Sequence, residues 1–147
     1  MIVQSNATQI FNNLWIGNEI IAKNASFMAK NNIKYVINIS CDIPNYFNCK
    51  TYMNISVKDK DVNQDEILCI FEMSGKFIFD ALNKDNGILV HCKQGNNKSA
   101  SIITYFLVKY LDIDLYDAVQ YLMAIRPNSL KRDSNFTKTL LVFKKSQ

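Results

Sequence analysis

The 147-residue sequence has few of the residues on which most cofactor and metal sites depend. It contains four glycines, one histidine, His91, and no Cys-x-x-Cys pair. The glycines are too far apart to form a G-x-G-x-x-G loop, which excludes a Rossmann dinucleotide site. A single histidine without paired cysteines argues against structural zinc. We therefore expect neither a cofactor nor a metal.

Long apolar runs are also missing. No stretch approaches the roughly 20 residues that cross a bilayer, and residues 1–14 have neither the basic start nor the apolar run of a secretory signal. The four cysteines should then stay reduced. We expect a protein of the cytoplasm, or of the nucleus by diffusion, with no membrane partner. The Lys-, Asn- and Ile-rich composition resembles the A/T-rich coding sequences of some viruses and protists, and a viral chain would act in the host cytoplasm.

Positive charge is only in slight excess over negative charge. Lys and Arg number 17 against 13 Asp and Glu, a net charge of +4. This balance favours anionic ligands but is far from that of a nucleic-acid-binding tail, so nucleic acid is not the expected partner. The length, the 48% hydrophobic content and the lack of repeats predict a single domain over residues 1–147.

Short β-branched runs alternate with helical periodicity along the chain. Residues 14–17, 35–39, 52–57 and 88–90 are typical of strands, and residues 26–31, 67–81, 99–111, 115–126 and 135–143 are typical of helices. This alternation predicts an α/β fold, with a mostly parallel, twisted central sheet flanked by helices.

The segment from residue 88 to residue 99 carries the chemistry. A buried strand ends at Cys92, a helix begins near Ser99, and six residues lie between them: Lys93, Gln94, Gly95, Asn96, Asn97 and Lys98. A strand–loop–helix unit directs main-chain N–H groups and a helix N-terminus at one point, which binds a phosphate or sulfate ion. The same donors favour the thiolate form of a cysteine placed there.

Three other interpretations of this segment are weaker. A Walker A loop needs glycines where the chain has Cys92 and Asn97. A Cys–His protease pair would join His91 to Cys92, but neighbours on a strand point to opposite faces. An inert buried cysteine is the usual fate of an isolated thiol, yet Cys92 is not isolated from other motif residues.

The sequence His91-Cys92-x-x-Gly95-x-x-Lys98-Ser99 resembles the signature of the protein tyrosine phosphatases, His-Cys-x5-Arg-Ser/Thr, in the dual-specificity branch. The small poxvirus-type phosphatases are especially similar in spacing. The resemblance covers nearly the whole chain. It extends to Leu14-Trp15-Ile16-Gly17-Asn18, residues 32–39, Phe71, Phe77-Ile78, Arg126-Pro127 and Asn135-Phe136.

This resemblance implies a two-step hydrolysis of phosphoprotein substrates, phosphorylated on tyrosine or on serine and threonine. Cys92 attacks phosphorus, an aspartate protonates the leaving oxygen, and the same aspartate later activates water. Ser99 stabilises the departing thiolate, His91 orients the loop, and the loop residues bind phosphate. No metal takes part. Some relatives act as RNA 5′-phosphatases, which is a third possibility.

Two carboxyl groups compete for the role of general acid. Counting back from Phe71 and Cys92, the family spacing leads to Asp61, whereas counting forward from the strand at residues 52–57 favours Asp59. Two downstream landmarks agree on Asp61, which is therefore our first candidate. Asp59 is the alternative.

Lys98 stands where the family has arginine. Arginine holds two phosphoryl oxygens with a planar fork, whereas lysine offers a compact charge. Losing one well-placed transition-state donor costs on the order of 10²–10³ in rate. The sequence thus predicts either a phosphatase of reduced activity or a pseudophosphatase that binds phosphoproteins. The retained Cys92 and candidate acid favour the enzyme.

Overall fold

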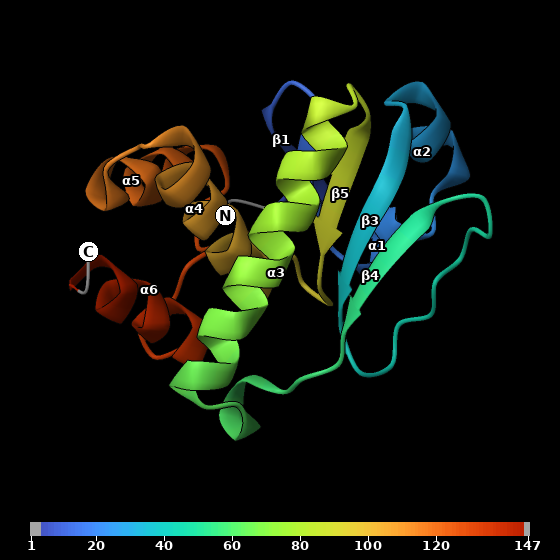
Figure 1. Cartoon of the computed structure of the whole chain (residues 1–147). Helices are drawn as coiled ribbons and strands as arrows, with labels where there is room; N and C mark the ends of the chain where they lie inside the picture. Colours follow the sequence, from blue (N-terminus) through green and yellow to red (C-terminus); the bar gives the residue numbers. More distant parts are fainter. Residues whose placement is uncertain (1–3, 146–147) are drawn as a thin grey trace.

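The computed structural model describes residues 4–145, in which one five-stranded sheet is covered by helices on both faces (Figure 1). The strand order is β1-β2-β5-β3-β4. The strands β2, β5, β3 and β4 are parallel, and β1 pairs with β2 in the antiparallel sense. The strands are β1 Ala7–Phe11, β2 Leu14–Gly17, β3 Ile33–Ile39, β4 Thr51–Ile55 and β5 Gly87–His91.

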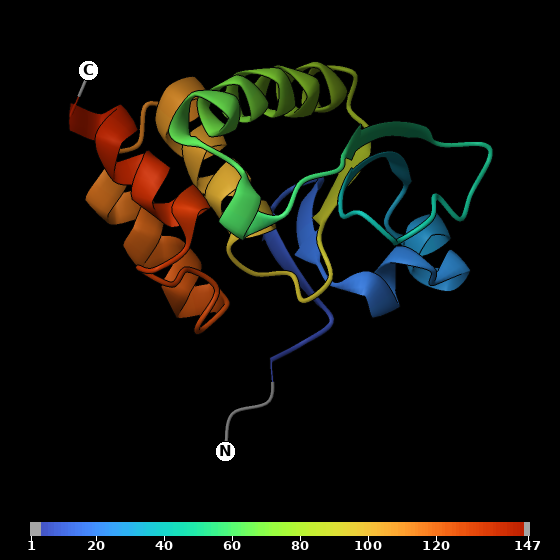
Figure 2. The ribbon, with the colours of Figure 1, turned by 90° about the horizontal axis from the view of Figure 1, so that it is seen from below.

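The helices form two unequal layers. Figure 2 shows α3 to α6 on one side of the sheet and the short helices α1 and α2 on the other. The helices are α1 Glu19–Ala22, α2 Ala25–Lys30, a 3-10 turn η1 Asp59–Asp61, α3 Gln64–Asn83, α4 Lys98–Leu111, α5 Leu115–Ile125 and α6 Asn135–Lys145. Within residues 4–145 no helix is long and apolar enough to cross a membrane.

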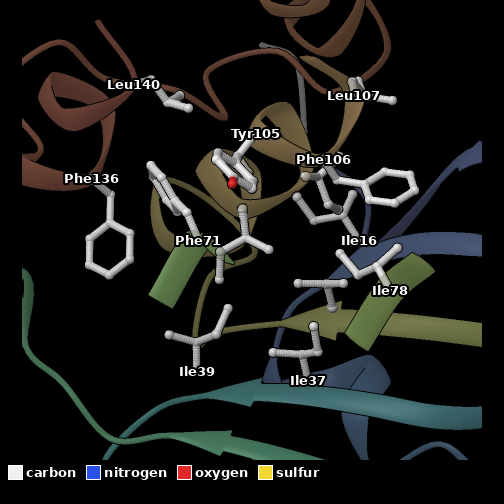
Figure 3. Packing of buried hydrophobic residues seen from close by; sticks show 14 of the residues in the cluster. Ile16, Ile37, Ile39, Phe71, Ile78, Tyr105, Phe106, Leu107, Phe136 and Leu140 are labelled. Atoms are coloured by element: carbon white, nitrogen blue, oxygen red, sulfur yellow. The ribbon is translucent and has the colours of Figure 1, made fainter. Parts of the chain in front are cut away.

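Successive side chains of a strand point to opposite faces of the sheet, and in the inner strands the side chains on both faces are apolar. In β2, Leu14 and Ile16 join the large core beneath α3 to α6, while Trp15 packs against the smaller cluster under α1 and α2. In β5, Val90 and Leu89 divide in the same way. Both strands therefore bury both faces, as inner parallel strands do. Figure 3 shows the larger core, where aromatic rings of α3, α4 and α6 meet isoleucines from the sheet.

Asparagine side chains set the starts of several helices. Asn18, Asn24 and Asn63 each precede a helix and accept hydrogen bonds from main-chain N–H groups of its first turn. Such caps satisfy donors that have no partner within the helix. The cap at Asn63 fixes where α3 begins, and with it the length of the segment that follows β4.

The predicted fold class is confirmed, and each predicted strand and helix is present with its ends shifted by a few residues. Three elements were not predicted: the edge strand β1, the short helix α1 and the turn η1. Each is short, and β1 is only partly buried, so its apolar pattern is weak. Residues 1–3, on which the expectation of no secretory signal partly depends, lie outside the described residues.

Candidate active site

The candidate site lies where the parallel strands end. His91, the last residue of β5, is level with Gly17 of β2 and Asn38 of β3. Residues 92–98, here called the anion loop, leave the sheet at this edge and lead into α4, at the lower end of the sheet in Figure 1. Ligands of open α/β sheets bind outside the carboxyl ends of the strands, so this edge is the expected place for a site.

Cys92 is buried but sits among polar groups of the loop. Its side chain is only 5% exposed. The Cys92 Sγ lies 3.1 Å from the Ser99 Oγ and 3.1 Å from the main-chain oxygen of Asn96. This proximity of the thiol and the Ser99 hydroxyl is what the family resemblance implied. The hydroxyl is placed to donate to sulfur when the sulfur is negatively charged.

Three successive carbonyls of the anion loop are held from outside the loop. The Lys93 oxygen accepts from the Glu19 N–H at 3.0 Å. The guanidinium of Arg126 donates to the Gln94 oxygen at 3.3 Å and to the Gly95 oxygen at 2.8 Å. The C=O and N–H of a trans peptide point in opposite directions. The N–H groups that follow these carbonyls therefore face the inside of the loop.

The peptide between Asn96 and Asn97 has the reverse orientation. Its carbonyl faces the Cys92 Sγ, and its N–H donates to the Ser129 oxygen at 2.7 Å. The Asn97 side chain also accepts from the Lys131 N–H at 2.9 Å. Asn97 thus ties the loop to the segment between α5 and α6, and in this conformation its N–H is turned away from the position of a bound anion.

Gly95 is required by both conformation and space. Its φ is +74°, in the left-handed region that side chains disfavour. A Cβ atom at this position would lie 2.4 Å from the Arg126 Nη2 and 2.8 Å from the Gly17 main-chain oxygen. The loop is therefore packed directly against β2 and Arg126.

The lysines of the loop differ in their surroundings. Lys93 is exposed, as is Gln94, whereas Lys98 is half-buried. The Lys98 Nζ donates to the main-chain oxygen of Val57 at 3.0 Å. It therefore connects the anion loop to residues 56–63, here called the β4–α3 segment, which contain both candidate acids.

The two candidate acids have different environments within that segment. The half-buried Asp59 carboxylate accepts hydrogen bonds from Ser134 Oγ, Asn135 N and Phe136 N at 2.9, 3.1 and 3.3 Å. It thus caps the start of α6. Asp61 is exposed and lines a pocket with residues that include Cys41 and Val57.

His91 is buried and neutral. Only 1% of its surface is exposed, and burial lowers its pKa from 6.5 to about 4. Its Nδ1 has no hydrogen-bond partner among the described residues. Burial is the larger cause of this lowered pKa, and a main-chain hydrogen bond of Cys92 opposes it.

Sequence reasoning missed the part played by Arg126. The residue was noted only as part of a C-terminal pattern, yet its side chain is 1% exposed and contacts the loop directly. The available signal was its rarity, since only Arg126 and Arg132 are arginines among 17 basic residues. The described residues contain no group of three or more His, Cys, Asp or Glu side chains that could hold a metal.

Comparisons with known proteins identify the family of the chain. Residues 14–146 match the family model "Dual specificity phosphatase, catalytic domain". The chain is 32% identical over 128 residues to protein phosphatase Slingshot homolog 3 of Mus musculus, covering 86% of the chain and 19% of the relative. It is 33% identical over 145 residues to a probable dual specificity protein phosphatase of Dictyostelium discoideum, covering 90% of the chain and 62% of the relative.

A solved structure has the same fold. The crystal structure of human DUSP28 superposes with a TM-score of 0.87 at 19% identity, covering 98% of this chain and 96% of that one. The chain spans about a fifth of the length of the mouse relative. With the family model matched over nearly the full sequence, the chain belongs to the family of dual specificity phosphatase catalytic domains.

Proposed function

We propose that the chain hydrolyses phosphotyrosine and phosphoserine or phosphothreonine monoesters of proteins through a cysteinyl-phosphate intermediate. The observation that carries this proposal is the position of the Cys92 sulfur. It lies beside the Ser99 hydroxyl, in a loop whose peptides after Lys93, Gln94 and Gly95 direct their N–H groups inward. Inward amides and the α4 N-terminus stabilise negative charge on sulfur and on a phosphoryl group.

The first step forms the sulfur–phosphorus bond. The Cys92 thiolate attacks phosphorus, the ester P–O bond breaks, and a carboxyl group gives its proton to the leaving oxygen. In the second step the resulting carboxylate takes a proton from water, whose oxygen attacks phosphorus. The S–P bond breaks, and the Ser99 hydroxyl donates a hydrogen bond to the departing thiolate. Inorganic phosphate is released.

Asp61 remains our first candidate for the acid, and Asp59 the alternative. The three hydrogen bonds that Asp59 accepts from Ser134, Asn135 and Phe136 hold its carboxylate at the start of α6, which competes with the role of a proton donor to a substrate. Asp61 is exposed and lines a pocket with Val57, the residue whose main-chain oxygen Lys98 of the anion loop contacts, which favours Asp61 as the acid. A role for Asp59 requires that it leave the start of α6.

Turnover of p-nitrophenyl phosphate tests the proposal. We expect activity in the wild type that is abolished in Cys92→Ser, because serine at this position is not ionised near neutral pH. A matched control is Cys69→Ser, which changes an exposed thiol of α3 and should leave the rate unaltered. A wild-type rate equal to that of Cys92→Ser contradicts catalysis.

A second candidate function is phosphoprotein binding with little turnover. Two contacts favour it: the Asn96 carbonyl faces the Cys92 sulfur, where it opposes a thiolate, and Lys98 donates to Val57. In this case Lys98→Arg should create or raise activity by about 10-fold or more, because a planar fork holds two phosphoryl oxygens. Calorimetry with a phosphotyrosine peptide provides the check. Cys92→Ser should retain the affinity, and a wild type that binds no phosphopeptide excludes this function.

A further inference from the structure

We propose that Arg126 is a positioning residue of the active site. Its guanidinium holds the carbonyls of Gln94 and Gly95 away from the substrate, so that the next two N–H groups face the phosphoryl group. It also supplies a fixed positive charge behind Cys92. This inference rests on the proposed role of the anion loop in binding phosphate.

The guanidinium of Arg126 lies between the anion loop and the N-terminal part of the described chain. Its Nε donates to the Gly95 oxygen at 2.8 Å and its Nη2 to the Gln94 oxygen at 3.3 Å. On the other side, its Nη1 donates to the Ser5 oxygen and to the Thr8 Oγ1, both at 2.9 Å. One rigid group thus joins residues near β1 to the anion loop.

These contacts determine which way two peptides of the loop face. Each peptide is planar and trans, so a carbonyl held outward requires that the N–H of the next residue point inward. Arg126 fixes the peptides after Gln94 and Gly95 in this way and thereby orients the N–H groups of Gly95 and Asn96. The next peptide, which Arg126 does not contact, is the one that is reversed.

The planar guanidinium of arginine suits this task better than the single ammonium group of lysine. Its five N–H donors lie in one plane at fixed angles, and Arg126 uses three of its nitrogens on four acceptors. A single ammonium nitrogen cannot replace nitrogens that lie apart. In a chain whose other basic residues are lysines except for Arg132, arginine occupies the position where the fork is needed.

The charge of Arg126 is buried without a carboxylate partner. Its four acceptors are three carbonyls and one hydroxyl, and the one salt bridge found among residues 4–145 joins Lys76 to Asp80. A buried cation is unfavourable unless an anion offsets it. Burial lowers the pKa of Arg126, and the negative charge of the Cys92 thiolate opposes that shift. We therefore expect a thiolate at Cys92 and a bound phosphoryl group to offset this charge.

Three variants of the full chain test the two parts of this role. Arg126→Met removes both the fork and the charge, Arg126→Lys keeps the charge without the fork, and Arg132→Met is the matched control at an exposed arginine. The measurements are the affinity for inorganic vanadate and the rate at which iodoacetamide alkylates the Cys92 peptide at pH 6.5, followed by mass spectrometry. Neither requires turnover. Circular dichroism verifies folding.

We expect Arg126→Met to lose at least about 30-fold in vanadate affinity and about 10-fold in alkylation rate. Arg126→Lys should restore the alkylation rate but not the affinity, and Arg132→Met should match the wild type. A folded Arg126→Met with both values within twofold of the wild type overturns the inference. If Arg126→Met does not fold, Arg126→Lys decides, because wild-type vanadate affinity in that variant overturns the positioning role. A wild type that neither binds vanadate nor turns over substrate contradicts the proposed function instead.

Discussion

The anion loop and the β4–α3 segment lie at the same edge of the sheet but are held very differently. In the loop, Cys92 and Gly95 are buried, as is Ser99 just after it, and the carbonyls of residues 93–96 all accept hydrogen bonds. In the segment, Asp61 is exposed and Asp59 half-buried. The segment's hydrogen bonds to other elements join the Val57 main-chain oxygen to Lys98 and the Asp59 carboxylate to the start of α6. Of its apolar side chains, Val62 is buried in the core and Val57 packs against it.

This difference separates a fixed part of the site from an adjustable one. A nucleophile benefits from donors that need no rearrangement at the moment of reaction. A general acid must meet leaving oxygens of different depth, from a long tyrosine to a short serine. The buried loop is suited to the first task and the exposed segment to the second.

The largest effect is expected from a change of Gly95, because it alters the fixed anion loop and leaves the β4–α3 segment untouched. Gly95→Ala places a Cβ against Arg126 and Gly17 and strains a residue at φ +74°. We expect kcat/KM to fall by on the order of 10³, because the inward N–H groups are displaced. Kinetics with p-nitrophenyl phosphate measures this. Met73→Ala, at an exposed position of α3, should retain activity within about twofold, and an equal loss in both variants would contradict the argument.

The pH dependence of stability tests how firmly His91 is buried at the end of β5, next to the anion loop. Its folded pKa, about 4, is below the ordinary value of 6.5, so the unfolded chain takes up the proton first. The free energy of unfolding should be at its full value above pH 6.5 and fall by about 3 kcal/mol between pH 7.5 and pH 4. Urea unfolding at both pH values checks this. His91→Gln lacks this component, and identical pH dependence of variant and wild type excludes it.

The smallest effects concern the adjustable segment. Asp59→Ala should lower the free energy of unfolding by about 1–2 kcal/mol, since the start of α6 loses a charged cap. Asp61→Ala should change it by less than about 0.5 kcal/mol. Denaturant titration separates the two variants, and equal losses would mean that the cap contributes nothing.

Kinetics on two substrates then identifies the acid. We expect Asp61→Ala to lose about 10² in kcat on phenyl phosphate but much less on p-nitrophenyl phosphate, whose leaving group needs little protonation. Asp59→Ala is the matched comparison. If the substrate-dependent loss appears in Asp59→Ala instead, Asp59 is the acid and the assignment of Asp61 is wrong.

The sequence predicted those parts of the molecule that depend on neighbouring residues. The strand that ends at Cys92, the loop and the helix after it form one continuous segment, so their pattern is complete within 12 residues, 88–99. The pairing of the thiol with Ser99 was implied by the family resemblance. The fold class followed from the alternation of apolar periods.

Features that depend on distant contacts could not be predicted. Arg126 meets the loop across 31 and 32 residues and meets Ser5 and Thr8 across 121 and 118. Asp59 meets α6 across 75 to 77 residues. No periodicity encodes such pairs. The reversal at Asn97 likewise arises from Ser129 and Lys131, which belong to a different part of the chain.

The bridge from Ser5 and Thr8 through Arg126 to Gly95 has a consequence for the order of events during folding. Contacts between residues far apart in sequence form late, because closing a long loop is entropically costly. A newly made chain can form β1 to β5 before Arg126 leaves the ribosome. The anion loop of that chain then lacks the two hydrogen bonds that Arg126 donates to the carbonyls of Gln94 and Gly95. The protein therefore gains its mature loop only after α5 has been synthesised and has docked, and a nascent chain should carry an unfinished site until then.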